Sequence, residues 1–203
     1  MSTFVTEIDL LRPDVTRAQL EAAAADARAR SAVVLVVHSC WTRLAADLLG
    51  GSGTRLGVLV GAPGGASTTL VKMFESDQAI EAGARRIESP LNVGALKSGL
   101  LEFVKDDIAG VLNSCRRIKR KQAELYVRLD LSLIDATEQR LAAEIVRAVH
   151  ADGVSLTHAG ASVTADDVGR FRTALGPEIV IKVCGTSLDE AALRAAGATN
   201  FEA

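Results

Sequence analysis

Long apolar runs are missing from this sequence, and so is a surplus of charge of either sign. No stretch of about 18 apolar residues occurs, and the first residues have neither a basic start nor an apolar run. We therefore expect a cytoplasmic protein that neither spans a membrane nor crosses one. Basic and acidic residues are interspersed and give a formal net charge of -2. This balance predicts neither nucleic acid nor an anionic membrane surface as a partner.

Cysteine and proline are also scarce. The three cysteines, Cys40, Cys115 and Cys184, lie far apart and form no CxxC pair, which excludes the usual spacing of zinc and redox sites and favours a reducing compartment. No nucleotide-binding glycine motif or cofactor lysine with its usual partners is visible, so we expect neither a metal nor a cofactor. With 203 residues, 48% of them hydrophobic, and only four prolines, the chain suits one compact domain over residues 1–203.

The sequence does contain a regular alternation of short apolar strands and amphipathic helices. Strands rich in β-branched residues and bounded by turn formers are expected at residues 33–37, 56–60, 125–129 and 179–183. Weaker candidates at residues 4–8, 86–91, 153–158 and 199–203 bring the number to eight, each but the last followed by a helical stretch. Eight alternations predict an α/β fold of the (β/α)8 TIM barrel type. A doubly wound open sheet is the alternative, because periodicity does not show closure.

Several segments carry a more specific pattern. They are Leu11-Arg-Pro-Asp-Val-Thr16, Leu49-Gly-Gly-Ser-Gly53, residues 60–72 and Asn92-Val-Gly-Ala-Leu-Lys-Ser-Gly99. In order and spacing they resemble the deoxyribose-phosphate aldolase family over nearly the whole chain. The resemblance implies a barrel with its chemistry at the carboxyl ends of the strands, a small-molecule carbonyl substrate, and a homodimer.

The resemblance also implies roles for particular positions. In that family a lysine on strand six forms a Schiff base with an aldehyde, a second lysine lies on strand seven, and an aspartate on strand four assists proton transfer. The matching positions here are Ser155, Lys182 and Glu88. A serine cannot form an imine, so the covalent mechanism is excluded at residue 155. Strand one departs too, because Glu7-Ile-Asp9 stands where the family has aspartate, histidine and threonine.

Period-two alternation, phased by this resemblance, turns a set of side chains toward the barrel interior or its rim. We predict that the catalytic groups are Lys182, Glu88 and Asp130. We predict that the substrate-binding groups are Ser155, Thr157, Arg128, Cys184 and His38. On strand five the acidic position is kept as Asp130, and Arg128 replaces an apolar residue that faces the same way.

Lys182 has two chemical options. A neighbouring cation and burial both lower a lysine pKa and free the neutral amine for imine formation, whereas nearby carboxylates oppose this. Only Arg128 is available to replace the family's second lysine as that cation. Charge therefore favours a protonated Lys182, paired with Glu88 or Asp130, acting as a general acid or oxyanion stabiliser. A structural salt bridge is the alternative without function.

The loops that hold phosphate in many barrels are reduced here. Only Cys184-Gly-Thr-Ser187 follows Lys182 before the next expected helix, and the sequence stops at Ala203, where a Gly-Ser loop would follow in the family. We therefore expect a substrate without phosphate. The Pro63-Gly-Gly65 turn after strand three can bring backbone amides near a ligand, but a tight turn is its simpler interpretation.

Three functions stay open on this evidence. The first is an aldolase-like enzyme that makes, breaks or rearranges a carbon–carbon bond next to a carbonyl, through Lys182 and Glu88. The second is a noncatalytic descendant that binds a metabolite or a protein. The third is a conventional deoxyribose-phosphate aldolase, which Ser155 disfavours.

Overall fold

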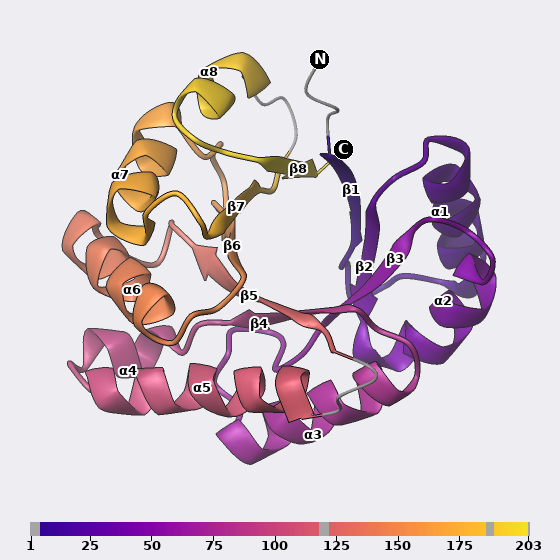
Figure 1. Cartoon of the computed structure of the whole chain (residues 1–203), viewed down its shortest axis with the longest axis horizontal. Helices are drawn as coiled ribbons and strands as arrows, with labels where there is room; N and C mark the ends of the chain where they lie inside the picture. The colour runs from indigo at the N-terminus through magenta and orange to yellow at the C-terminus, as the bar shows by residue number, and fades with distance from the viewer. Residues whose placement is uncertain (1–4, 118–121, 186–188, 203) are drawn as a thin grey trace.

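The computed structural model describes residues 5–117, 122–185 and 189–202. Parallel strands close into an eight-stranded barrel in chain order, and the helices lie around its outside (Figure 1). β1 (Val5–Leu10) pairs with β2 (Val34–His38) on one side and with β8 (Asn200–Glu202) on the other. The predicted TIM barrel is confirmed, and this closure excludes the open sheet.

The remaining elements alternate as expected along the described chain. The other strands are β3 (Arg55–Leu59), β4 (Arg86–Pro90), β5 (Glu124–Asp130), β6 (Gly153–Thr157) and β7 (Val180–Val183). The helices are α1 (Arg17–Ala29), α2 (Thr42–Leu49), α3 (Thr69–Glu81), α4 (Val93–Lys97), α5 (Leu101–Arg117), α6 (Ala136–Ala148), α7 (Ala165–Leu175) and α8 (Glu190–Ala195), with a 3-10 turn, η1 (Ser39–Trp41), before α2. Within these described elements, every helix is too short or too polar to cross a membrane.

Side chains that point outward from the strands form the hydrophobic core between barrel and helices. Ile87 on β4, Leu125 on β5 and Ile181 on β7 are fully buried there, and each is flanked by residues that point inward. This alternation is what period two requires of a strand whose two faces are both covered.

The barrel interior has an apolar side and an ionic side. On the apolar side, Val34 and Val36 fill the space beside Gly57, where a Cβ atom would lie 3.0 Å from the Val36 side chain. On the ionic side, β1, β4, β5 and β7 send charged residues inward. Barrel interiors are usually filled by branched apolar side chains, so this ionic side marks where the chain departs from a purely structural core.

Candidate active site

Lys182 lies at the centre of the ionic side and is fully buried. Its Nζ donates to Asp9 Oδ1 at 2.6 Å and to Glu88 Oε1 at 2.9 Å. The same nitrogen lies 3.2 Å from Glu7 Oε2. Lys182 therefore pairs with Glu88, one of its two expected partners, and with two carboxylates of β1 that were not expected.

Two arginines complete this arrangement. Arg128 Nη1 donates to Asp9 Oδ2 at 3.1 Å and to Glu88 Oε2 at 2.8 Å. Deeper in the barrel, Arg86 Nη1 donates to both carboxylate oxygens of Glu7 at 2.6 Å. We call the set of Lys182, Arg86, Arg128, Glu7, Asp9 and Glu88 the buried ionic network. Its three cations and three carboxylates give it no formal net charge.

The network holds Lys182 in its protonated form. Burial alone lowers the pKa of an ammonium group, but Asp9, Glu88 and Glu7 together raise the pKa of Lys182 well above its ordinary value. Burial likewise raises the pKa of Glu88, but Lys182 and Arg128 outweigh it and lower that pKa to about 2. An ammonium nitrogen has no free electron pair, so Lys182 cannot attack a carbonyl in this state.

Cys184 and Glu202 lie beside Asp9. The Cys184 Sγ is 3.7 Å from Asp9 Oδ2, and burial raises the pKa of this thiol well above its ordinary value. It is therefore a protonated thiol and a poor nucleophile. Burial and the charge of Asp9 raise the pKa of Glu202. Candidate metal-ligand atoms of Asp9, Cys184 and Glu202 lie within 4.8 Å of one another, but Lys182 and Arg128 already neutralise Asp9, so this donor set does not require a cation.

A cavity of about 350 Å³, which we call the mouth pocket, opens at the carboxyl ends of strands β3 to β6. Its polar lining is Arg128, Asp130 and Thr157, and apolar side chains form the rest. Lys182 and Glu88 do not line it, because both are fully buried. Arg128, with 18% of its side chain exposed, connects the buried ionic network to this open volume.

Arg128 and Asp130 keep hydrogen-bonding capacity toward the mouth pocket. Both ion-pair bonds of Arg128 use Nη1, and within the described chain no acceptor is bound to its Nε or Nη2. Asp130 Oδ1 accepts from Ser132 N at 3.0 Å and from Ala159 N at 3.2 Å, while Oδ2 has no donor among the described residues. Burial raises the pKa of Asp130, but the bonds from Ser132 and Ala159 outweigh it and lower that pKa, so the carboxylate is ionised at neutral pH.

Known proteins show where this barrel belongs. No family model matches the chain. The deoxyribose-phosphate aldolase of Streptococcus gordonii is 35% identical over 200 residues, which cover 96% of this chain and 88% of the relative. The enzyme of the same name from Brevibacillus brevis is 35% identical over 179 residues, covering 87% and 78%. This chain belongs to the deoxyribose-phosphate aldolase family.

Solved structures agree on the fold of this deoxyribose-phosphate aldolase family member. The tetrameric deoxyribose phosphate aldolase of Aeropyrum pernix superposes with a TM-score of 0.85 at 21% identity, over 98% of this chain and 85% of that one. QR15, an aldolase, gives a TM-score of 0.86 at 20% identity, over 97% and 88%. At these identities the likeness concerns the barrel alone, so the chemistry has to be read from the side chains.

Most side chains predicted for the site come together. Ser155 on β6 pairs in register with Arg128 on one side and Lys182 on the other, and it is fully buried. Its hydroxyl has no hydrogen-bond partner among the described residues, which is uncommon for a buried hydroxyl. Thr157 lies on the mouth pocket and bonds the Leu129 carbonyl at 3.3 Å.

His38 does not join the site as predicted. Its Nε2 lies 2.8 Å from the Leu11 carbonyl, which ties the end of β2 to the segment that follows β1. His38 is also not among the residues that line the mouth pocket. The reduced phosphate loops expected after Lys182 and at Ala203 include residues 186–188 and 203, which lie outside the described residues.

Glu7, Asp9, Arg86 and Glu202 were not predicted as site residues. One signal was available for the first two, because residues two apart on an apolar strand share a face and two carboxylates on an inward face need cationic partners. The sequence of β1 alone does not show which cations pair with these two carboxylates, because the pairing depends on the closure of β1 against β8.

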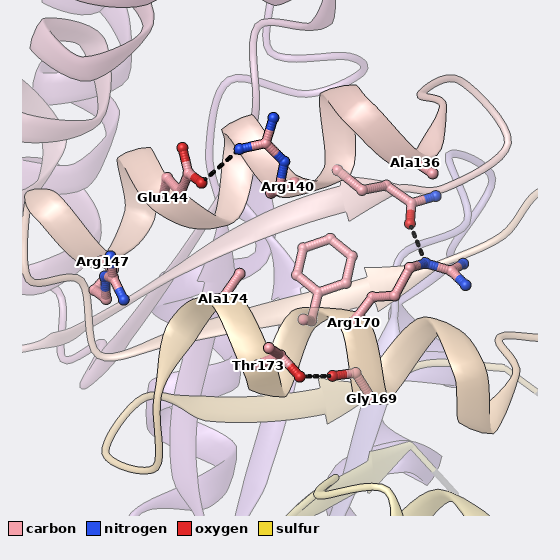
Figure 2. Close-up of a pocket in the computed structure, with 10 residues that line it drawn as sticks. Ala136, Arg140, Glu144, Arg147, Gly169, Arg170, Thr173 and Ala174 are labelled. Carbon is pink, nitrogen blue, oxygen red and sulfur yellow. Dashed lines mark hydrogen bonds and ion pairs between the residues drawn. The ribbon is translucent and has the colours of Figure 1, made fainter.

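A larger groove, of about 570 Å³, lies on the helical exterior between α6 and α7 (Figure 2). Arg140, Arg147 and Arg170 line it, and Arg140 pairs with Glu144 at 2.9 Å. It holds no residue of the buried ionic network and lies away from the barrel interior. Size alone therefore does not make it the reaction site.

Proposed function

We propose that this chain makes or breaks a carbon–carbon bond next to a carbonyl, in a small molecule without phosphate, and that it does so without an imine. One observation carries the proposal: Lys182 Nζ is fully buried against Asp9, Glu88 and Glu7. An imine requires a neutral amine that can reach the carbonyl carbon. Lys182 offers neither property, and the position where the resemblance expects the family's Schiff-base lysine is Ser155.

In this proposal, Arg128 and Asp130 are the catalytic residues that touch substrate. A β-hydroxy carbonyl compound lies in the mouth pocket with its carbonyl oxygen at the free N–H groups of Arg128 and its hydroxyl at Asp130. Asp130 accepts the hydroxyl proton, the O–H electron pair forms a new C=O bond, and the adjacent C–C bond breaks. The electron pair of that bond passes into an enolate whose oxygen Arg128 stabilises. Asp130 then returns the proton to the enolate carbon, and the reverse sequence forms the bond.

Lys182 and Glu88, which were predicted to be catalytic, become positioning residues. Glu88 and Asp9 both accept from Arg128 Nη1, which fixes the guanidinium at the lining of the mouth pocket and leaves Nε and Nη2 without an acceptor among the described residues. Lys182 offsets the charge of these carboxylates, so that Arg128 is not fully neutralised by them. A guanidinium held in this way is preorganised for a developing oxyanion.

Cleavage and trapping together test the proposal. The probe is 4-hydroxy-4-methylpentan-2-one, a β-hydroxy ketone that yields two acetone molecules, with acetone followed by NMR. We expect acetone release that falls by about a hundredfold or more in Asp130→Asn, because the amide keeps the Oδ1 acceptor but removes the base. Asp166→Asn, at an exposed position on α7, serves as the matched control and keeps the wild-type rate. Parallel reactions with sodium borohydride are expected to leave the Lys182 peptide unmodified by mass spectrometry.

Two results would overturn this route. A substrate-dependent reduced adduct on Lys182, absent from Lys182→Arg, would show that the lysine is the nucleophile after all. Acetone release that is unchanged in Asp130→Asn would remove the proposed base.

The complete burial of Lys182 and Glu88 also favours a second candidate function, a noncatalytic protein that binds a small molecule in the mouth pocket. It predicts ligand affinity that depends on Asp130, with neither cleavage nor exchange of the α-protons of the bound ketone into deuterated water. Exchange above the rate of the Asp130→Asn variant would exclude this candidate.

A further inference from the structure

Apolar side chains form much of the lining of the mouth pocket. Leu59 and Leu91 lie at or just beyond the ends of β3 and β4, and Val93 begins α4. Leu133, between β5 and α6, also lines the pocket, with 50% of its surface exposed. A single exposed leucine needs no explanation, but this one lies on a concave surface with other apolar side chains. A ligand that covers it removes apolar area from water.

The charges around the same pocket oppose a phosphate. Arg128 is the one basic residue among the described residues that line it, and its charge is already shared with Asp9 and Glu88. Asp130 adds a carboxylate at the pocket itself. A phosphate ester carries a charge of about -2, so inside the mouth pocket Asp130 would repel it, and Arg128 would be the one cation of the described lining to attract it.

The volume leaves room for more than the reacting atoms. An apolar cavity of about 150 Å³ holds a benzene molecule, and the mouth pocket measures about 350 Å³. A four-carbon β-hydroxy ketone between Arg128 and Asp130 occupies the polar side. The remaining space, along Leu91, Val93 and Leu133, is large enough for a ring.

We infer that the substrate is a β-hydroxy carbonyl compound that ends in an aromatic or branched aliphatic group, packed against Leu91, Val93 and Leu133, and not a sugar phosphate. The inference rests on the proposed function for the carbonyl and hydroxyl contacts. It adds the chemistry of the other end of the molecule, which the reaction itself does not determine.

Binding of three probes to the full chain tests this inference by calorimetry or ligand-observed NMR. They are 4-hydroxy-4-phenylbutan-2-one, 4-hydroxybutan-2-one, which lacks the ring, and 2-deoxyribose 5-phosphate. We expect the phenyl probe to bind about tenfold or more tightly than the unsubstituted ketone, because the ring buries apolar surface. We also expect the sugar phosphate to bind more weakly than the phenyl probe.

Variants at the rim locate the effect. Leu133→Lys replaces apolar surface by a cation. We therefore expect it to lower the affinity for the phenyl probe by about tenfold and to raise the affinity for the sugar phosphate. Leu70→Lys is the matched control, since Leu70 is 76% exposed on α3 and does not line the mouth pocket. Leu133→Ala provides a second variant without a new charge. It should lower the affinity for the phenyl probe and leave the affinity for the other two probes unchanged.

Equal affinity for the phenyl and unsubstituted probes, tightest binding of the sugar phosphate, or no effect at Leu133 would overturn the inference. Its failure is separable from failure of the proposed function, because binding is measured without turnover. Leu133-dependent binding with no cleavage of any probe counts against the reaction and leaves the ligand class standing. Cleavage of 4-hydroxy-4-methylpentan-2-one, together with equal affinity for the probes with and without the ring, supports the reaction and counts against the ligand class.

Discussion

Replacing Lys182 by methionine is expected to lower the free energy of unfolding by about 3–5 kcal/mol, the usual cost of removing one partner from a buried ion pair. Methionine fills most of the volume of the lysine stem, so the loss reports charge more than packing. Without the ammonium, the buried carboxylates of Glu7, Asp9 and Glu88 share the two arginines Arg86 and Arg128. Urea denaturation at neutral pH measures the difference.

Lys97→Met provides the control for this expectation. Lys97 also pairs with a glutamate, at 2.8 Å, but 48% of its side chain is exposed. Exposed pairs contribute about 1 kcal/mol or less, so this variant should unfold almost like the wild type. If both substitutions cost the same small amount, the buried ionic network does not stabilise the barrel in the way proposed. A non-additive cost in Lys182→Met combined with Glu88→Gln would show directly that the two residues are coupled.

Gly65→Ala is expected to lower the free energy of unfolding by about 2–5 kcal/mol, because backbone strain and a steric clash act at the same residue. Gly65 has a φ of 70°, which favours glycine, and a Cβ atom there would lie 2.3 Å from the Pro90 carbonyl oxygen and 2.6 Å from that of Leu91. Relief requires the segment between β3 and α3 to move away from the end of β4. Since Pro63 and Leu91 line the mouth pocket from these two segments, binding of the phenyl probe should be lost as well.

Gly53→Ala, in the connection between α2 and β3, is the control, because a Cβ atom at Gly53 has no neighbour within 4 Å and its backbone needs no positive φ. Thermal unfolding should place this variant within about 0.5–1 kcal/mol of the wild type. A Gly65→Ala protein with unchanged stability and unchanged probe affinity would show that the Pro63-Gly-Gly65 turn is not fixed against β4. The simpler interpretation of this turn, as a tight connection, and its place beside a ligand pocket are both consistent with the contacts.

The barrel was predictable because its determinants are local and repeated. Each strand is a short β-branched run, such as Ile179–Val183, and capped helices such as α6, which begins after Asp135, lie between the strands. Eight such units leave few ways to bury both faces of every strand. Closure was not local, since it depends on β1 meeting β8 across the whole chain.

The site was predictable in part, for a different reason. Period two placed Arg128 and Lys182 on inward faces, and the resemblance set the phase. The complete burial of Lys182 and Glu88 was not predictable. Lysine and glutamate are mostly exposed in proteins, so residue type gives no reason to expect it. Glu7 and Asp9 pair with Lys182 from β1, a strand that is not hydrogen-bonded to β7, so this contact could not be read from either strand alone.

The protonation state of Lys182 is the property on which the imine-free route depends most directly. A raised pKa in the folded state means that protonation of Lys182 stabilises the fold fully at pH values below the ordinary 10.5, as long as its carboxylate partners are ionised. This contribution is lost as the pH rises through the folded pKa. NMR of isotope-labelled lysine nitrogens, with Lys182→Met to assign the signal, measures this pKa. We predict an ammonium signal for Lys182 that persists from neutral pH to beyond 10.5. A neutral amine at Lys182 near neutral pH would contradict that prediction and restore the lysine as a nucleophile.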